Sequence, residues 1–248
     1  MSRIGIIDWG IGGVSIYKLI KERMPGVPVT YFSDTGEVPY GKMSRSELTF
    51  RLNTVIEYLK TRGATHVVIG CNAASTAIGD LKDHAVPIFG VIEPAVRMTA
   101  RSRPSNLGLI GGRRTVLSGV HRRGFARRGI SVRQRIAQPL SGLIESGDVS
   151  SRRLHSEAQR ILGPLRGCSH VLLACTHYPA ILSVLRQHAP EVKFLDPAEE
   201  LVEVLKRQRL GRSRGRDEFL TTGSSAGMKK ASRLAFRVRI PVVTTVGL

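Results

Sequence analysis

Short apolar runs alternate with stretches of helical periodicity along most of the chain. Residues 3–8, RIGIID, form an apolar run that ends in an aspartate, and the glycine-rich WGIGG separates them from residues 14–24, whose apolar positions have helical spacing. A strand and a helix are again predicted at residues 29–34 and 44–60, the helix opening with a capping box of Ser44 and Glu47. Alternating strands and helices are typical of parallel sheets with right-handed crossovers, so the pattern predicts an α/β fold.

The rest of the chain continues this alternation. Further strands are predicted at residues 66–70, 88–92, 106–112 and 170–174, and a strand that enters a loop at 132–140. Helices are predicted from Ser75, at 150–162, in the second part of 193–208 after a short strand, and around 228–236. We expect the C-terminal segment, with strand-like residues 218–223 and 240–246, to cross back and complete the first half of the molecule.

Two sequence patterns repeat at almost the same offset. HVLLAC at 170–175 resembles HVVIGC at 66–71, and their cysteines are 104 positions apart, whereas aligning Gly5 with Gly108 gives an offset of 103. This indicates an internal duplication. We therefore predict two pseudo-symmetric α/β domains, each a mainly parallel sheet flanked by helices, with the active site in the cleft between them. The predicted domains are residues 1–96 plus about 210–248, and residues 97–209.

The composition is consistent with this architecture. Apolar residues make up 42% of the 248 residues and aromatic residues only 5%, which favours buried strands rich in valine, isoleucine and leucine. The N-terminus lacks the apolar core of a signal peptide, and no segment approaches the roughly 20 apolar residues of a membrane span. We expect a cytoplasmic protein without membrane contact, whose three cysteines are thiols rather than a disulfide framework.

The formal net charge is +19, and arginine supplies most of the positive charge. Aromatic residues that could stack on bases are not interleaved with the arginines, and no nucleic-acid-binding motif is present. The pattern favours an arginine-rich solvated surface, with weak, salt-sensitive binding to polyanions as the alternative. The arginine pairs and the densest basic run are Arg113-Arg114, Arg122-Arg123, Arg127-Arg128, Arg152-Arg153 and residues 206–216.

Chemically reactive residues gather at the predicted strand ends, where open parallel sheets bind their ligands. A cysteine between a strand and a following helix is well placed for a lowered pKa, because the helix N-terminus favours the thiolate. The residues at predicted strand ends are Asp8, Asp34, Cys71, Glu93, Cys175, His177 and Asp196.

The repeated cysteines predict two-base proton transfer. If Cys71 and Cys175 face each other across the cleft, one thiolate removes a proton from one face of a carbon atom while the other thiol delivers a proton to the opposite face. Asp8 could manage the proton of the first thiol, and His177 that of the second. Hydrogen-bond donors must stabilise the charge that develops on the adjacent carboxylate.

Other candidates fit structural roles better. Cys168 has no twin and is predicted to be a core residue. His66 and His170 start their strands, away from the proposed cleft. The GIGG segment lacks the spacing of a dinucleotide fingerprint, which argues against nicotinamide binding. A zinc site formed by Cys71, Cys175 and His177 is an alternative, but the sequence has no C-x-x-C pair that would favour it.

Several segments together resemble the glutamate racemases of the aspartate/glutamate racemase superfamily. They are IGIIDWGIGGVSI, YFSDTGEVPYGKMS, IGCNAAS, VIEPAV and LACTHYPAI, and the resemblance extends from residue 4 to about residue 225. It implies a racemase that needs no cofactor or metal, interconverts L- and D-glutamate and supplies D-glutamate for peptidoglycan. The implied catalytic residues are Cys71, Cys175, Asp8 and His177. The implied substrate-binding positions are Trp9, Pro39, Tyr40, Gly41, Asn72, Ala73 and Thr176.

Two of these positions depart from the family pattern. The family has serine at the position of Trp9 and threonine at the position of Ala73, so each change removes a hydroxyl that contacts the amino acid, worth about 0.5–1.5 kcal/mol. A Trp9 side chain inside the cleft would shrink the pocket, and one outside would be harmless. The alternatives are a racemase of another amino acid such as aspartate, or a non-catalytic racemase-like protein that binds a polyanion or a protein, as gyrase binding is known in the family. A homodimer is an expected assembly by the same resemblance.

Overall fold

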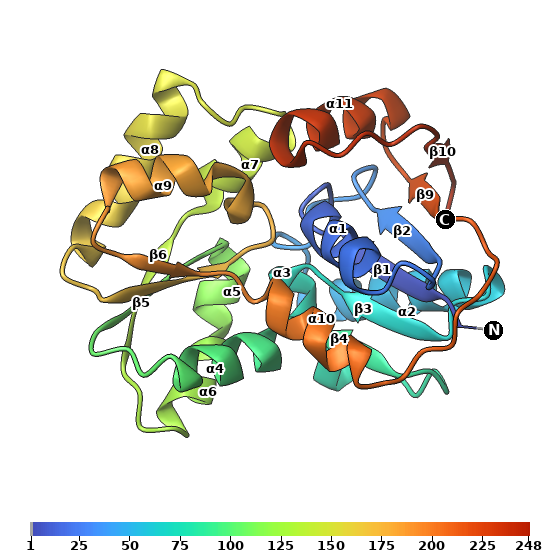
Figure 1. Ribbon diagram of the computed structural model, residues 1–248, viewed down its shortest axis with the longest axis horizontal. Helices are drawn as coiled ribbons and strands as arrows, with labels where there is room; N and C mark the ends of the chain where they lie inside the picture. Colours follow the sequence, from blue (N-terminus) through green and yellow to red (C-terminus); the bar gives the residue numbers. More distant parts are fainter. Residues whose placement is uncertain (1) are drawn as a thin grey trace.

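The computed structural model describes residues 2–248 and contains two separate β-sheets with helices packed on their faces (Figure 1). The first sheet has the strand order β10-β9-β2-β1-β3-β4, and the second has the order β6-β5-β7-β8. All neighbouring strands in both sheets are parallel. The predicted α/β class with two mainly parallel sheets is confirmed.

The elements follow one another in the predicted alternation. The strands of the first sheet are β1 (Ile4–Asp8), β2 (Val29–Ser33), β3 (His66–Ile69), β4 (Ile88–Gly90), β9 (Glu218–Thr221) and β10 (Thr244–Thr245), and those of the second are β5 (Leu107–Gly111), β6 (Val132–Ile136), β7 (His170–Ala174) and β8 (Lys193–Leu195). The helices are α1 (Val14–Arg23), α2 (Arg45–Thr61), α3 (Asn72–Ser75), α4 (Ile92–Arg101), α5 (Arg113–Ser118), α6 (Val120–Ala126), α7 (Gln138–Glu145), α8 (Arg152–Leu162), α9 (Leu182–His188), α10 (Ala198–Lys206) and α11 (Ser225–Phe236). Short 3-10 turns are η1 (Ile78–Asp80), η2 (Gly163–Leu165) and η3 (Tyr178–Ile181).

The two sheets repeat one four-strand arrangement. The order β2-β1-β3-β4 in the first sheet corresponds to β6-β5-β7-β8 in the second. Strand β1 is in register with β2 and β3 in the way that β5 is with β6 and β7, at positions offset by the 103 or 104 residues seen in the sequence repeat. The paired positions are Ile4 with Val29 and His66, and Leu107 with Val132 and His170.

The central strands are buried because helices cover both faces of each sheet. Every residue of β1, β2 and β5 is buried. The apolar face of α2, including Leu52, Val55 and Leu59, packs on Ile7 and Val67 of the first sheet. Burying each such side chain contributes about 1.5–3 kcal/mol. Helix α2 begins with the predicted capping box, in which Ser44 and Glu47 bond each other's main-chain N–H groups.

Two helices connect the halves of the molecule. Helix α11, which follows β9, packs against α7 and η3, and α10 packs against α1 and α4 (Figure 1). The C-terminal strands β9 and β10 extend the first sheet, as predicted for the segment that crosses back. Domain boundaries near residues 96 and 210 remain our proposal. Within residues 2–248, no helix has both the length and the apolar composition needed to cross a bilayer.

Three predicted elements differ from the structure. The helix expected from Ser75 onward is wrong: the single turn α3 ends at Ser75, and only the short 3-10 turn η1 follows it. The Ser75 and Thr76 hydroxyls donate to main-chain carbonyls and compete with further helix. The strand expected at 88–92 stops at Gly90, and Pro94 lies in the first turn of α4, where a proline is tolerated. The loop expected after β6 is helix α7, which buries Leu140 and Ile144.

Candidate active site

One cavity of about 280 Å³ lies between the two halves, at the carboxyl ends of their strands. Asp8 ends β1, and Cys71 follows β3 on one wall. Cys175 and His177 follow β7 on the other wall. The structure therefore brings these four residues into one cavity, as the sequence repeat predicted.

Two glycines let the loop after β1 approach the opposite wall closely. A Cβ atom on Gly10 would lie 2.1 Å from a carboxylate oxygen of Glu145, and one on Gly12 would lie 2.3 Å from the hydroxyl of Thr176. Any other residue would push the walls apart. Close packing against the opposite wall thus explains the glycines at positions 10 and 12 of the GIGG segment.

His177 connects Cys175 to a carboxylate in the second half. Its Nδ1 lies 3.6 Å from Sγ of Cys175, and its Nε2 lies 2.6 Å from Oε2 of Glu145. The same Glu145 oxygen accepts the main-chain N–H of Ile11 at 3.0 Å. Burial lowers the pKa of His177, but the hydrogen bonds to Cys175 and Glu145 outweigh it and raise the pKa well above its usual value. The charged imidazole of His177 therefore lies directly beside the sulfur of Cys175.

Asp8 is buried and faces both halves of the molecule. One carboxylate oxygen accepts the hydroxyl of Thr176 at 2.9 Å, and the other accepts the N–H of Gly10 at 3.3 Å. Burial raises the pKa of Asp8 to about 6, although the positive charge of His177 and both hydrogen bonds act in the opposite direction. Asp8 can therefore exchange a proton near neutral pH.

The expectation of a lowered pKa is wrong for Cys71. Burial raises the pKa of this thiol, and the negative charges of Asp8 and Cys175 act in the same direction. The N–H groups of Ala73 and Ala74 do favour the thiolate, as expected for a residue before a helix, but α3 is a single turn and their effect is smaller. Cys71 is thus a protonated thiol, poised to donate.

The cavity also contains unpaired polar groups. Asn72 is 3% exposed, and neither its amide nitrogen nor its amide oxygen has a hydrogen-bond partner in the part of the chain that the structure describes. Leaving such a group unpaired costs about 1–3 kcal/mol, which a polar ligand would recover. Asn72 lines the cavity, so it is suited to bind a polar substrate.

A main-chain turn forms another part of the wall. Pro39, Tyr40, Gly41 and Lys42 line the cavity, and the N–H of Lys42 donates to the carbonyl of Pro39 at 2.7 Å. Among residues 2–248, the N–H groups of Tyr40 and Gly41 have no main-chain acceptor. A turn with free N–H groups can bind an anion.

The two departures from the family pattern both lie in the cavity wall. Trp9 is half-buried, and its indole N–H donates to the carbonyl of Glu37 at 3.0 Å, so it is not free for a ligand. Ala73 offers no hydroxyl. In the opposite half, Thr115 is buried and places a hydroxyl-bearing side chain in the wall.

Three strand-end residues lie outside the cavity wall. Asp34 is buried in a network with Arg51 and Tyr40, and Glu93 pairs with Arg128 at the surface. Asp196 accepts the N–H of Ala198 near a different hollow. Asp34 and Asp196 do follow strands, whereas Glu93 lies in the first turn of α4, and the side chains of all three serve other contacts. The residues with predicted structural roles also lie elsewhere: Cys168 is in the core, and His66 and His170 start β3 and β7.

The sequence did not indicate several residues of the site, among them Glu145, Thr115, Lys42 and Arg113. Glu145 was missed because helix α7 was read as a loop. A signal was present, since Leu140, Leu143 and Ile144 have helical spacing and an acidic residue at a helix C-terminus opposes the helix dipole. A residue in that unfavourable position often has another partner, here His177.

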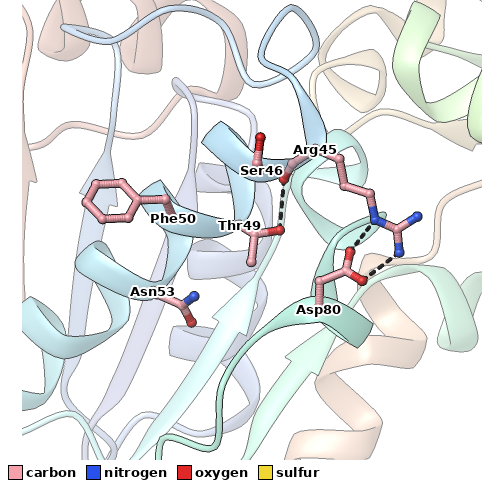
Figure 2. A pocket seen from close by; sticks show the side chains of 6 residues that line it. All are labelled: Arg45, Ser46, Thr49, Phe50, Asn53 and Asp80. Atoms are coloured by element: carbon pink, nitrogen blue, oxygen red, sulfur yellow. Dashed lines mark hydrogen bonds and ion pairs between the residues drawn. The ribbon is translucent and has the colours of Figure 1, made fainter.

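A larger surface hollow of about 660 Å³ lies along the start of α2, away from the thiols. Figure 2 shows that the guanidinium of Arg45 and the carboxylate of Asp80 bind each other there, at 2.6 Å for both contacts. Its charged groups are thus already paired. No group of three or more His, Cys, Asp or Glu side chains within residues 2–248 is arranged to hold a metal ion.

A parallel α/β architecture with a thiol on each wall of one interdomain cavity defines a class of enzyme, the two-base racemases. Such an enzyme removes a proton from one face of a carbon atom and returns a proton to the other. Cys71 and Cys175 are the two candidate acid–base groups, and Asp8, His177 and Glu145 surround them.

Comparisons with known proteins identify the family. The chain is 34% identical over 220 residues to the glutamate racemase of Desulforudis audaxviator, covering 84% of this chain and 80% of that protein, and 30% identical to that of Aquifex aeolicus, covering 94% and 93%. A structure of glutamate racemase from Thermus thermophilus, in complex with beta-chloro-D-alanine, has a TM-score of 0.87 at 28% identity and covers 100% of this chain and 97% of that one. Residues 4–205 match the Asp/Glu/Hydantoin racemase family. The chain belongs to this family.

Proposed function

We propose that this protein racemises glutamate with Cys71 and Cys175 as the two acid–base groups. The observation that carries the proposal is the placement of one thiol on each wall of a single cavity. The relatives that match most of the chain are glutamate racemases, which supports glutamate as the substrate. Cationic Lys42 and Arg113 line the cavity as well, and they favour a substrate with a second carboxylate.

The different surroundings of the two thiols support a direction for the proton: His177 contacts Cys175, whereas burial raises the pKa of Cys71. Cys175, beside the His177 imidazolium, acts as the base that removes the α-proton, and the electrons of the broken C–H bond move toward the substrate carboxylate. Cys71, a protonated thiol, delivers its proton to the opposite face of the same carbon. Cys175 is then a thiol and Cys71 a thiolate, so the enzyme is ready for the reverse reaction.

The surrounding groups accept or return protons at the two thiols and bind the substrate. Asp8, with a pKa of about 6, accepts or returns a proton on the side of Cys71. His177 does so on the side of Cys175, and Glu145 keeps its imidazole oriented and charged. We assign the free N–H groups of Tyr40 and Gly41 and the amide nitrogen of Asn72 to the carboxylates of the substrate, and the amide oxygen of Asn72 to its ammonium. Pro39 and Thr176 line the same space.

The departures at Trp9 and Ala73 are compatible with this assignment. The Trp9 indole bonds to Glu37, so its ring acts as a wall of the cavity. The Thr115 side chain supplies a hydroxyl from the second half in place of those absent from the first. In a cell, the product would be D-glutamate for peptidoglycan. A homodimer, binding of nucleic acid or gyrase, and a cytoplasmic location stay predictions.

Racemisation of each candidate substrate, followed by circular dichroism, tests the proposal. We expect glutamate to be preferred over aspartate by at least about tenfold in kcat/KM, because one methylene is worth roughly 10–200-fold in a fitted pocket. Cys71→Ala and Cys175→Ala should each lower kcat by about 1000-fold or more. Cys168→Ala, the matched control at the third cysteine, should keep the wild-type rate. Equal use of aspartate would overturn the substrate, and activity of either site variant would overturn the mechanism.

A further inference from the structure

The turn that carries Tyr40 and Gly41 is held firmly from its own half. The hydroxyl of Tyr40 donates to the buried carboxylate of Asp34 at 2.7 Å. The indole of Trp9 donates to the carbonyl of Glu37, three residues before Tyr40. These contacts fix the side chain of Tyr40 and the approach to the turn, but they do not bond the main chain from Tyr40 to Met43.

The main chain of the turn is held from the opposite half, by Arg114. Its Nε donates to the carbonyl of Tyr40 at 3.1 Å, and one terminal nitrogen donates to the carbonyl of Met43. Arg114 belongs to α5 of the second half, and its neighbours Arg113 and Thr115 line the cavity. Arg114 itself is not part of the cavity wall. Arg114 therefore connects the two halves of the molecule beside the cavity, without lining the space that a substrate would fill.

The geometry of these two hydrogen bonds suits a guanidinium. Arginine presents several N–H donors in a rigid planar fork, so one side chain can bond two carbonyls at once. The two acceptors are three residues apart and enclose the stretch that carries Gly41 and Lys42. A lysine ammonium is a single point and lacks this fork.

We propose that Arg114 is a positioning residue that bridges the cleft and holds the Tyr40–Met43 turn where its free N–H groups meet the side-chain carboxylate of the substrate. The proposal deepens the assignment of an acidic substrate and rests on it. The side-chain carboxylate does not change its charge during proton transfer at Cα. Weaker contacts to this carboxylate therefore reduce the binding of the substrate and of the transition state equally, which raises KM and leaves kcat nearly unchanged.

The matched control is Arg123, an exposed arginine on α6. Its Nη1 donates to the carbonyl of Ser118 at 2.8 Å, so it also bonds a main-chain carbonyl, but within its own half. Arg123→Ala removes the same charge and the same type of bond without affecting the cleft. Arg114→Ala, Arg114→Lys and Arg123→Ala form the test set.

Hydrogen–deuterium exchange of the free enzyme gives the first readout and needs no substrate. In Arg114→Ala, the peptide covering residues 37–43 should exchange faster than in the wild type, because the Lys42 N–H bond to Pro39 opens more often. Arg123→Ala should leave this peptide unchanged. Unaltered exchange in Arg114→Ala would overturn the bridging role even if the enzyme had no activity on glutamate.

Steady-state kinetics give the second readout. Arg114→Ala should raise KM for both glutamate enantiomers by about tenfold while kcat changes less than about threefold, Arg114→Lys should lie between it and the wild type, and Arg123→Ala should match the wild type. A wild-type KM in Arg114→Ala, or a loss confined to kcat, overturns the proposal. A wild-type enzyme inactive on glutamate overturns the proposed function instead, and the exchange measurement then decides the bridging role alone.

Discussion

His177 makes the surroundings of the two thiols different, because it contacts Cys175 and not Cys71. It contacts Cys175 on one side and Glu145 on the other, and these contacts keep it charged despite its burial. Within residues 2–248, no histidine bonds Cys71 in this way, and burial raises the pKa of its thiol. The two cysteines are duplicated, but the side chains around them differ, and a two-base reaction needs such a difference between its two acid–base groups.

The raised pKa of Asp8 predicts how kcat/KM falls at low pH. Its pKa of about 6 belongs to the free enzyme, so kcat/KM should fall as the pH drops through about 6, where the carboxylate gains a proton and can no longer accept one. Asp8→Asn, which fixes the neutral form, should remove this limb and lower kcat/KM by about 100-fold. The measurement is kcat/KM for L-glutamate between pH 5 and 9. An unchanged acid limb in the variant would assign it to another group.

The stability of Asp8→Asn provides an independent control. The folded state raises the pKa of Asp8, so its proton stabilises the fold at low pH, and this contribution is lost as the pH rises through about 6. The variant should therefore be more stable than the wild type at pH 8 and similar to it near pH 4. The loss of activity at low pH then cannot come from unfolding caused by Asp8.

The sequence was informative about residues that repeat and uninformative about those that do not. Asp8, Cys71, Cys175 and His177 follow strands that the repeat identifies, so their meeting in one cavity could be predicted. Glu145 has no counterpart motif and contacts His177 from a helix end. Its role depends on tertiary packing, which periodicity does not encode.

At the scale of elements, the loop between β2 and α2 is built around one buried charge. Asp34 is fully buried, and its carboxylate accepts hydrogen bonds from Arg51, Tyr40 and Thr222. Arg51 comes from α2, and Thr222 follows β9, the neighbour of β2 in the same sheet. Asp34 therefore ties a helix, a strand end and the cavity turn together, and this position at a strand end serves the loop rather than the chemistry.

Removing the partner of Asp34 should destabilise the protein strongly. Arg51→Ala leaves a carboxylate buried without its cation, which typically costs about 3–5 kcal/mol. The measurement is the free energy of unfolding in urea. Arg45→Ala, in the same helix, removes an exposed partner of Asp80 (Figure 2) and should leave that free energy within experimental error. Equal effects of the two variants would contradict the central place of Asp34 in this loop.

Elements with strong periodicity were predicted well, and short ones were not. Helices α1, α2 and α8 and the central strands follow the predicted ranges closely, since a long apolar pattern fixes both type and position. The single turn α3, the start of α4 and the short helix α7 were wrong or missed. In each of these, a few hydrogen bonds or one packing contact outweigh the local pattern.

At the scale of the whole molecule, duplication explains why the thiols face each other. The two sheets share strand order and register, so Cys71 and Cys175 leave equivalent strands and meet where the carboxyl ends of both sheets converge. The C-terminal strands β9 and β10 and the helix α11 break the symmetry, because they extend the first half and contact the second. The sequence offset predicted the common arrangement, and the cross-cleft contacts of Arg114 and Glu145 became visible only in the structure.

The most direct test of two-base racemisation follows deuterium from solvent into glutamate. Wild-type enzyme is incubated with a single enantiomer in D2O, the reaction is stopped at low conversion, the enantiomers are separated, and deuterium at Cα is measured by mass spectrometry. With separate thiols on opposite faces, the product should carry deuterium and the recovered substrate should keep its original proton. Deuterium in both enantiomers to the same extent, or protium retained in the product, would mean that one group serves both faces and would contradict the account.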